Sequence, residues 1–239
     1  MKKSTYLSKI LIAGFLLITG SCTMQKMNSR MVRDIDGNIY TVVTIGEQQW
    51  LGEDLKTTKY NDGTPIQNVA DITEWRHSDY PAYAWYDNDI MYKSTHGAMY
   101  NWWAAGSRSG LCPKGWRVAT DNDWKKLEKF LGMSAEQIEG TAMRGTNEGG
   151  KLKEAGTENW SVTNENVTNE YNFSVVPGGR RADNGLFSNL KNTATYWTAT
   201  ETSPSCAVYR HFGGGSIQIG RNIEAEKKYG LAVRCIRDK

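Results

Sequence analysis

Apolar residues near the start of the chain occur in three short runs, at residues 32–35, 39–45 and 48–51. Within each run they alternate with polar residues or follow one another, which is typical of strands with a buried face. The pairs Asp36-Gly37 and Gly46-Glu47 separate the runs, and both pairs favour tight turns. The pattern therefore predicts a three-stranded antiparallel meander.

Helical periodicity is clearest in the stretch that follows Thr120. Thr120 and Asp123 are spaced as a capping pair, and Gly132 stands where the helix would end. Ser134 is a capping residue for a second short helix, and residues 97–105 predict another with an aromatic face. The core-facing side of the first helix is expected to carry four residues: Trp124, Leu127, Phe130 and Leu131.

The rest of the domain is predicted to contain long loops followed by strands. Residues 151–192 are rich in Gly, Asn, Thr and Ser and show little periodicity, which is typical of loops. Apolar alternation then returns and predicts four strands, at residues 195–200, 207–212, 216–220 and 231–237. A meander, two or three short helices, long loops and closing antiparallel strands define an α+β fold.

The N-terminal residues predict an export signal with a lipid anchor. Three lysines precede an apolar stretch at residues 10–18. As a helix this stretch would span about 14 Å, which is too short to cross a bilayer. Small residues then lead directly to Cys22, which resembles the bacterial lipobox, although Thr19 stands where a leucine is preferred. We expect Cys22 to be lipidated and to anchor the chain in the outer membrane, with ordinary cleavage near Ser21 as the alternative.

This interpretation divides the chain into a signal peptide at 1–21, a lipid-anchored tether at 22–31 and one domain at 32–238. The whole chain has 29 Lys and Arg against 26 Asp and Glu, but three of the lysines belong to the signal. The exported part is therefore neutral. A neutral surface gives no reason to expect nucleic acid or anionic lipid as a partner.

Four cysteines are present, and three remain for the domain if Cys22 carries lipid. Cys112, Cys206 and Cys235 allow three alternative pairs with one thiol left over. We favour Cys112–Cys235, which would tie the middle of the domain to its last strand in an oxidising compartment. The alternative is that all three are reduced.

The aromatic residues are unusual in kind, with 9 Trp and 12 Tyr against 5 Phe. A Trp or Tyr ring can stack on the C–H face of a sugar while nearby polar side chains bind its hydroxyls. Two groups predict such a ligand platform: Trp85, Tyr86 and Asp87, and Trp160 with Asn164, Asn166 and Arg180. Aromatic residues would equally fill the core of a loop-rich fold, which is the alternative for both groups.

No motif in the sequence predicts a catalytic or metal site, and we expect no cofactor. The three histidines include no pair with zinc spacing, and Cys206 and His211 would point to opposite faces of one strand. The aspartates before Gly37 resemble a calcium loop only briefly, because that glycine is in the wrong position. Residues 213–215 are three glycines, which favour a turn between strands because no helix follows.

Longer phrases occur in order along the chain. They include Asp34-Ile-Asp-Gly-Asn-Ile-Tyr40, Gly97-Ala-Met-Tyr-Asn-Trp102, Leu111-Cys-Pro-Lys-Gly-Trp-Arg-Val118, Pro177-Gly-Gly-Arg180 and Tyr229-Gly-Leu-Ala-Val-Arg-Cys235. Together they closely resemble the Fibrobacter succinogenes major paralogous domain, found in exported proteins and lipoproteins of Bacteroidota and Fibrobacterota, over residues 32–238. That family has no established activity, so the resemblance implies a domain without implying its function.

The block from Trp116 to Trp124 and the closing phrase at Tyr229 also resemble, more distantly, C-type-lectin-like and formylglycine-generating-enzyme-like domains. That resemblance implies an early helix paired with a terminal strand, often with a long disulfide between them. The residues of the lectin calcium site are missing, because Trp197 is followed by Thr198 and not by an Asn-Asp pair. The likeness therefore supports the fold and supplies no function.

We therefore expect a non-catalytic lipoprotein of the cell envelope whose domain binds or adheres to a glycan or a surface protein. Two alternatives stay open. One is a structural component of the cell surface without a small-molecule site, and the other is an enzyme of unknown class, such as a glycosidase whose paired carboxylates sequence spacing cannot reveal.

Overall fold

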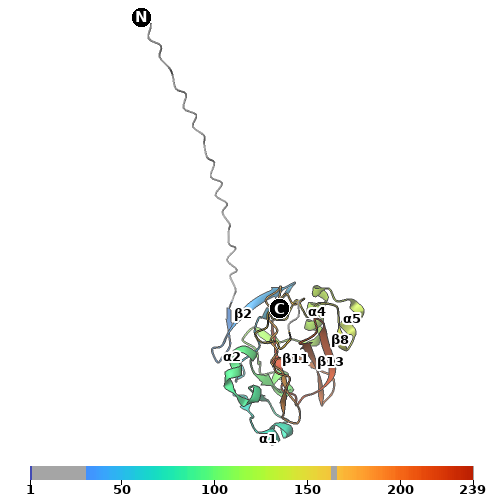
Figure 1. Cartoon of the computed structure of the whole chain (residues 1–239). Helices are drawn as coiled ribbons and strands as arrows, with labels where there is room; N and C mark the ends of the chain where they lie inside the picture. The colour runs from blue at the N-terminus through green and yellow to red at the C-terminus, as the bar shows by residue number, and fades with distance from the viewer. Residues whose placement is uncertain (2–30, 163–165, 239) are drawn as a thin grey trace.

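A computed structural model describes Met1, residues 31–162 and residues 166–238 of the chain (Figure 1). The predicted signal peptide, Cys22 and Asn164 lie outside the described residues. No helix within the described ranges is long and apolar enough to span a membrane.

The first sheet contains the predicted meander and also the last strand of the chain. Its five strands follow the order β1-β2-β3-β15-β7, so β15 lies between β3 and β7. Ile236 of β15 pairs with Trp50, and Cys235 pairs with Val118, both antiparallel. The bounds are Met31–Arg33 for β1, Ile39–Ile45 for β2, Gln48–Leu51 for β3, Trp116–Val118 for β7 and Cys235–Arg237 for β15.

The second sheet, of order β14-β11-β12-β13-β8, forms the centre of the fold. Its strands are β8 (Ala142–Arg144), β11 (Thr193–Glu201), β12 (Cys206–Gly213), β13 (Ile219–Glu226) and β14 (Ala232–Val233). The bounds predicted for the strand at 216–220 are wrong, because β13 begins only at Ile219 and continues to Glu226. Two smaller sheets join β4 (Gln67–Asn68), β5 (Ala82–Ala84) and β6 (Met99–Tyr100), and β9 (Arg180–Arg181) with β10 (Phe187–Ser188).

The helices are short, and the longest is the one predicted after Thr120. This helix, α4 (Asp121–Leu131), begins with a complete capping box between Thr120 and Asp123 and ends at Gly132 in the left-handed conformation. The others are α1 (Ile72–His77), η1 (Tyr86–Asn88), η2 (Ile90–Tyr92), α2 (Lys93–His96), α3 (Trp102–Ala105) and α5 (Ala135–Glu139).

One helical residue does not lie where the periodicity places it. Phe130 is 52% exposed, and its ring packs edge-on against Tyr171 instead of entering the core. The other three residues of the predicted face are buried. The stretch predicted as one helix at 97–105 divides into β6 and α3.

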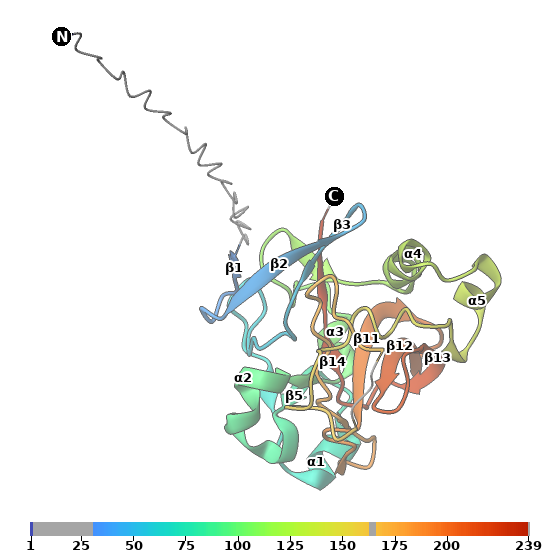
Figure 2. The ribbon, with the colours of Figure 1, turned by 45° about the horizontal axis from the view of Figure 1, so that its top comes forward.

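Most buried apolar residues of the described ranges belong to two large clusters rich in aromatic rings, and a smaller cluster surrounds Trp75. Trp50, Trp124 and Phe173 pack together in one, and Trp197 with Tyr100 in the other. Cys112 and Cys235 form a fully buried disulfide in the second cluster, which confirms the favoured pairing. Figure 2 shows α4 and α5 beside β13. Sheets and helices that mix in this way confirm the α+β class.

Candidate functional site

The first predicted platform is buried. Trp85 is 4% exposed, and the ammonium group of Lys93 lies 5.6 Å from the centre of its ring. Tyr86 is also buried and packs against Tyr92 and Phe187. Of the three residues only Asp87 is exposed. No ring face at this position is open to a sugar, so the core-packing alternative describes these aromatic residues.

The second predicted platform does not assemble around Trp160. Its ring is 4% exposed, its Nε1 donates a hydrogen bond to the carbonyl of Val175, and the Lys153 ammonium lies 4.0 Å from its centre. Asn166 is exposed on the loop, and Arg180 belongs to β9. Trp160 is a core residue that covers a buried lysine.

That lysine organises the glycine-rich turn. Lys153 is 1% exposed, and its Nζ donates hydrogen bonds to the carbonyls of Gly213, Gly214 and Ser216. Burial lowers its pKa to about 8. The three glycines therefore form a turn between β12 and β13, as the sequence favoured. The carbonyls of Gly213 and Gly214 accept hydrogen bonds from the Lys153 ammonium, whereas a phosphate-binding loop directs N–H groups at an anion.

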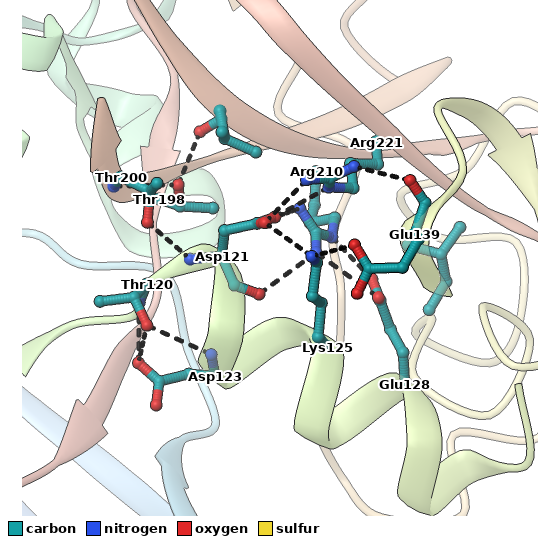
Figure 3. Close-up of polar contacts among 12 residues, drawn as sticks. Thr120, Asp121, Asp123, Lys125, Glu128, Glu139, Thr198, Thr200, Arg210 and Arg221 are labelled. Atoms are coloured by element: carbon teal, nitrogen blue, oxygen red, sulfur yellow. Dashed lines mark hydrogen bonds and ion pairs between the residues drawn. The ribbon is translucent and has the colours of Figure 1, made fainter. Parts of the chain in front are cut away.

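A network of buried ions joins α4 to one face of the central sheet (Figure 3). Arg210 donates to Glu128 at 2.6 Å and to Asp121 at 2.7 Å. Arg221 forms a two-pronged pair with Asp121, and Arg144 pairs with Glu128 at 2.8 Å. Hydrogen bonds from the arginines outweigh the effect of burial and lower the pKa of Asp121. Each carboxylate is already held by arginines, so the network fixes the helix and leaves no open binding group.

The opposite face of the same sheet is half-exposed. Gly179 pairs with Ala194 in parallel, which places Arg180 beside Thr195. Thr195 pairs with His211, and His211 pairs with Gly220. Directly paired residues share a face, so these side chains lie in one row across the strands.

Two tyrosines complete this surface. Tyr209 lies two residues before His211 on β12, with the ring centres 5.7 Å apart. The guanidinium carbon of Arg180 lies 5.6 Å from the ring centre of Tyr229. All four side chains are half-buried. We call the surface formed by Arg180, Tyr209, His211 and Tyr229 the Arg180 face.

The Arg180 face contains buried polar atoms that have no partner among the described residues. They are Nε of Arg180, Nδ1 of His211 and Oγ1 of the neighbouring Thr193. None of the ion pairs formed within the described residues includes Arg180. The next residue, Arg181, differs sharply: it is fully buried and donates to the carbonyls of Val69, Ala70 and Gly185. A buried polar atom without a partner is costly, and the described residues contain others as well, including Nε1 of Trp50 and of Trp124 in the core.

The local charge favours an acceptor-rich ligand. Burial, assisted by Arg144 and Arg180, lowers the pKa of His211, so its imidazole is neutral at neutral pH. The imidazole lies directly over Gly220, where a Cβ atom would collide with it. A guanidinium, a neutral imidazole and two phenol rings can together bind a carboxylate or hydroxyl-rich group.

A surface cavity of about 340 Å³ adjoins this surface at the edge of the sheet. His211 and Asn222 line it together with Thr141 and Glu224. Cys206, the free thiol at the start of β12, is half-buried, and its Sγ lies 3.7 Å from Oγ of Ser205. Among the described residues, no three His, Cys, Asp or Glu side chains are grouped to hold a metal ion.

Sequence reasoning identified only one member of the Arg180 face. Arg180 was singled out with loop residues, whereas its neighbours in space come from strands. Alternation along β12 gives a usable signal for two more, since Tyr209 and His211 are two residues apart and share a face. Tyr229 could be added only from the tertiary structure.

These features define the class of protein: an α+β domain closed by a buried disulfide, with a half-buried polar–aromatic face on its central sheet. The model of the family described as Fibrobacter succinogenes major domain matches residues 43–237 of the chain. The chain belongs to this family, which confirms the resemblance seen in its motifs. Neither a curated protein nor a solved structure matches the chain.

Proposed function

We propose that this protein is a non-catalytic binding module of the cell envelope, and that it binds a glycan or a protein segment on the Arg180 face. The observation that carries the proposal is the half-exposed guanidinium of Arg180, which forms no ion pair within the described residues and lies beside half-exposed aromatic rings. A bound ligand would give the Arg180 guanidinium the ion partner that the described residues do not provide.

The chemistry of the face favours a ligand that carries a carboxylate. Arg180 is a fixed positive charge near Tyr229, and a guanidinium binds a carboxylate through two parallel hydrogen bonds. The rings of Tyr209 and Tyr229 can contact the apolar face of a sugar or a side chain. Acidic glycans and acidic peptide segments combine these two properties.

The location in the envelope is part of the same proposal. The apolar stretch near the N-terminus, followed by Cys22, supports export and lipidation, with the outer membrane as the site of the anchor. The disulfide between Cys112 and Cys235 agrees with an oxidising compartment.

A glycan and peptide array probed with the exported chain tests the proposal. Arg180→Ala should weaken binding by about 10-fold or more, because one charge-assisted pair is lost. Arg108→Ala, at an exposed arginine in another loop, is the matched control and should bind normally. If the array shows no ligand, or if both variants bind equally, the Arg180 face is not a binding site and the structural alternative stands.

A further inference from the structure

Exposed apolar side chains gather at one corner of the domain. In the described residues beyond Met1, those that are large and exposed are Met31, Ile35, Ile39, Ile72, Ile90, Met91, Phe130, Val162 and Leu186. The first three belong to the β1–β2 hairpin, and Ile90 and Met91 belong to η2. Ile90 is 63% exposed and Met91 is 77% exposed, which is unusual for residues that could have packed inside.

Residues from the two segments line one shallow groove of about 400 Å³. Ile39 lines the groove on the hairpin side, and Ile90 and Met91 line it on the side of η2. Asn38 and Ser94 are its uncharged polar lining residues. The only charged residues that line the groove are Lys56 and Lys93. We call the surface formed by Ile39, Lys56, Ile90, Met91 and Lys93 the Ile90 corner.

Both lysines have their ammonium groups near aromatic rings. The ammonium of Lys56 lies 5.7 Å from the ring centre of Tyr40, and that of Lys93 lies 5.6 Å from the ring centre of Trp85. Such lysines cover apolar surface with their methylene groups and present the charge at its rim. An apolar centre with a basic rim is the pattern of surfaces that lie in the membrane interface.

The path of the chain brings this corner close to the predicted anchor. The described part of the domain begins at Met31, in the hairpin that contributes Ile39, and α2 lies next to that hairpin (Figures 1 and 2). Only residues 23–30 separate Cys22 from Met31. Even fully extended, so short a segment reaches about 30 Å. A tether of this length keeps the surface around the point of attachment within reach of the bilayer.

We propose that the Ile90 corner rests on the lipid surface of the membrane that holds the anchor. This inference depends on the lipidation of Cys22 in the proposed function. Ile39, Ile90 and Met91 enter the boundary between headgroups and acyl chains, while Lys56 and Lys93 contact lipid phosphates. The exported chain as a whole is neutral, so the contact is local and depends on the apolar residues as well as on charge.

This contact would also orient the domain. Leu186, near α1, is exposed on a different segment of the chain, and Gly185 beside it packs against Ile72. Figure 2 places α1 at the opposite end of the domain from the point where the chain enters. Leu186 therefore marks a surface that would stay in water when the Ile90 corner touches lipid.

The test places an environment-sensitive fluorophore at each of these surfaces in the full-length lipoprotein. Ser94→Cys and Leu186→Cys, each combined with Cys206→Ser, are labelled and reconstituted into vesicles of phosphatidylethanolamine and phosphatidylglycerol. The label at position 94 should shift its emission to the blue and be quenched by a lipid-borne nitroxide. The label at position 186 should do neither. Ile90→Ser with Met91→Ser should remove most of the shift at position 94.

Each other result overturns the inference. Equal emission at positions 94 and 186 in vesicles shows that the corner stays in water. A shift at position 94 that grows with protein concentration without vesicles shows that a second copy covers the corner. A mass spectrum without lipid on Cys22 removes the anchor and this inference together, whereas a lipidated chain with a water-exposed label refutes the inference alone.

Discussion

Replacing Arg210 with Met should destabilise the domain strongly. The Arg210 side chain is fully buried, and it pairs with Glu128, also fully buried, and with Asp121. The substitution keeps most of the volume but leaves Glu128 with Arg144 as its ion partner. Removing one member of a buried ion pair costs up to about 3–5 kcal/mol of unfolding free energy, because the buried carboxylates of Glu128 and Asp121 each lose one of the cations that compensate for their desolvation. For a domain of this size, the melting temperature should fall by roughly 10 °C.

A matched substitution in the same network separates burial from charge. Lys125, whose side chain is 20% exposed, pairs with the 67% exposed Glu139 at 2.5 Å and more loosely with Asp121 at 3.6 Å. Lys125→Met should therefore cost less than about 1 kcal/mol, as exposed ion pairs do. Urea denaturation followed by tryptophan fluorescence measures both variants. If the two free energies of unfolding differ by less than about 1 kcal/mol, burial of the network is not what stabilises α4 against the sheet.

Three further predictions concern the disulfide, a buried histidine and one glycine. Replacing Cys112 and Cys235 with Ser should lower the unfolding free energy by up to about 5 kcal/mol, because the bond closes a long loop; denaturation that is unchanged by a reductant would contradict this. Burial lowers the pKa of His96 from 6.5 to about 4, so the unfolded chain takes up a proton first as the pH falls. Stability should drop by about 1–2 kcal/mol between about pH 7 and pH 5, and His96→Asn should reduce that drop. Gly220→Ala should cost about 2 kcal/mol by displacing His211, and His211→Ala in the same chain should recover part of the loss, as thermal melts would show.

Local elements followed the sequence closely because their determinants are neighbours along the chain. The turn at Asp36-Gly37 and the capping box at Thr120 act over three or four residues, and both lie where the pattern places them. The start of β13 could not be found in this way. β13 begins later than predicted because Lys153, some 60 residues earlier, donates a hydrogen bond to the carbonyl of Ser216 and keeps this residue in the turn.

The candidate site was harder to predict than the fold for the same reason. Composition identified an excess of Trp and Tyr, but burial of Trp85 and Trp160 depends on lysines that reach their rings from other segments. Arg180 was singled out from the sequence, yet its neighbours follow from the bridge between Gly179 and Ala194. Pairing between distant segments is not encoded in any periodicity of a single segment.

The position of β15 between β3 and β7 determines when the domain can finish folding. The N-terminal strands are synthesised first. The pairs of Trp50 with Ile236 and of Val118 with Cys235 can form only after residues 235–237 have been synthesised. Until then the sheet has two unfinished edges, and Cys112 lacks its native disulfide partner. A nascent chain that is almost complete should therefore still be vulnerable to proteases and to aggregation, and loss of these few residues should be as damaging as loss of a whole helix.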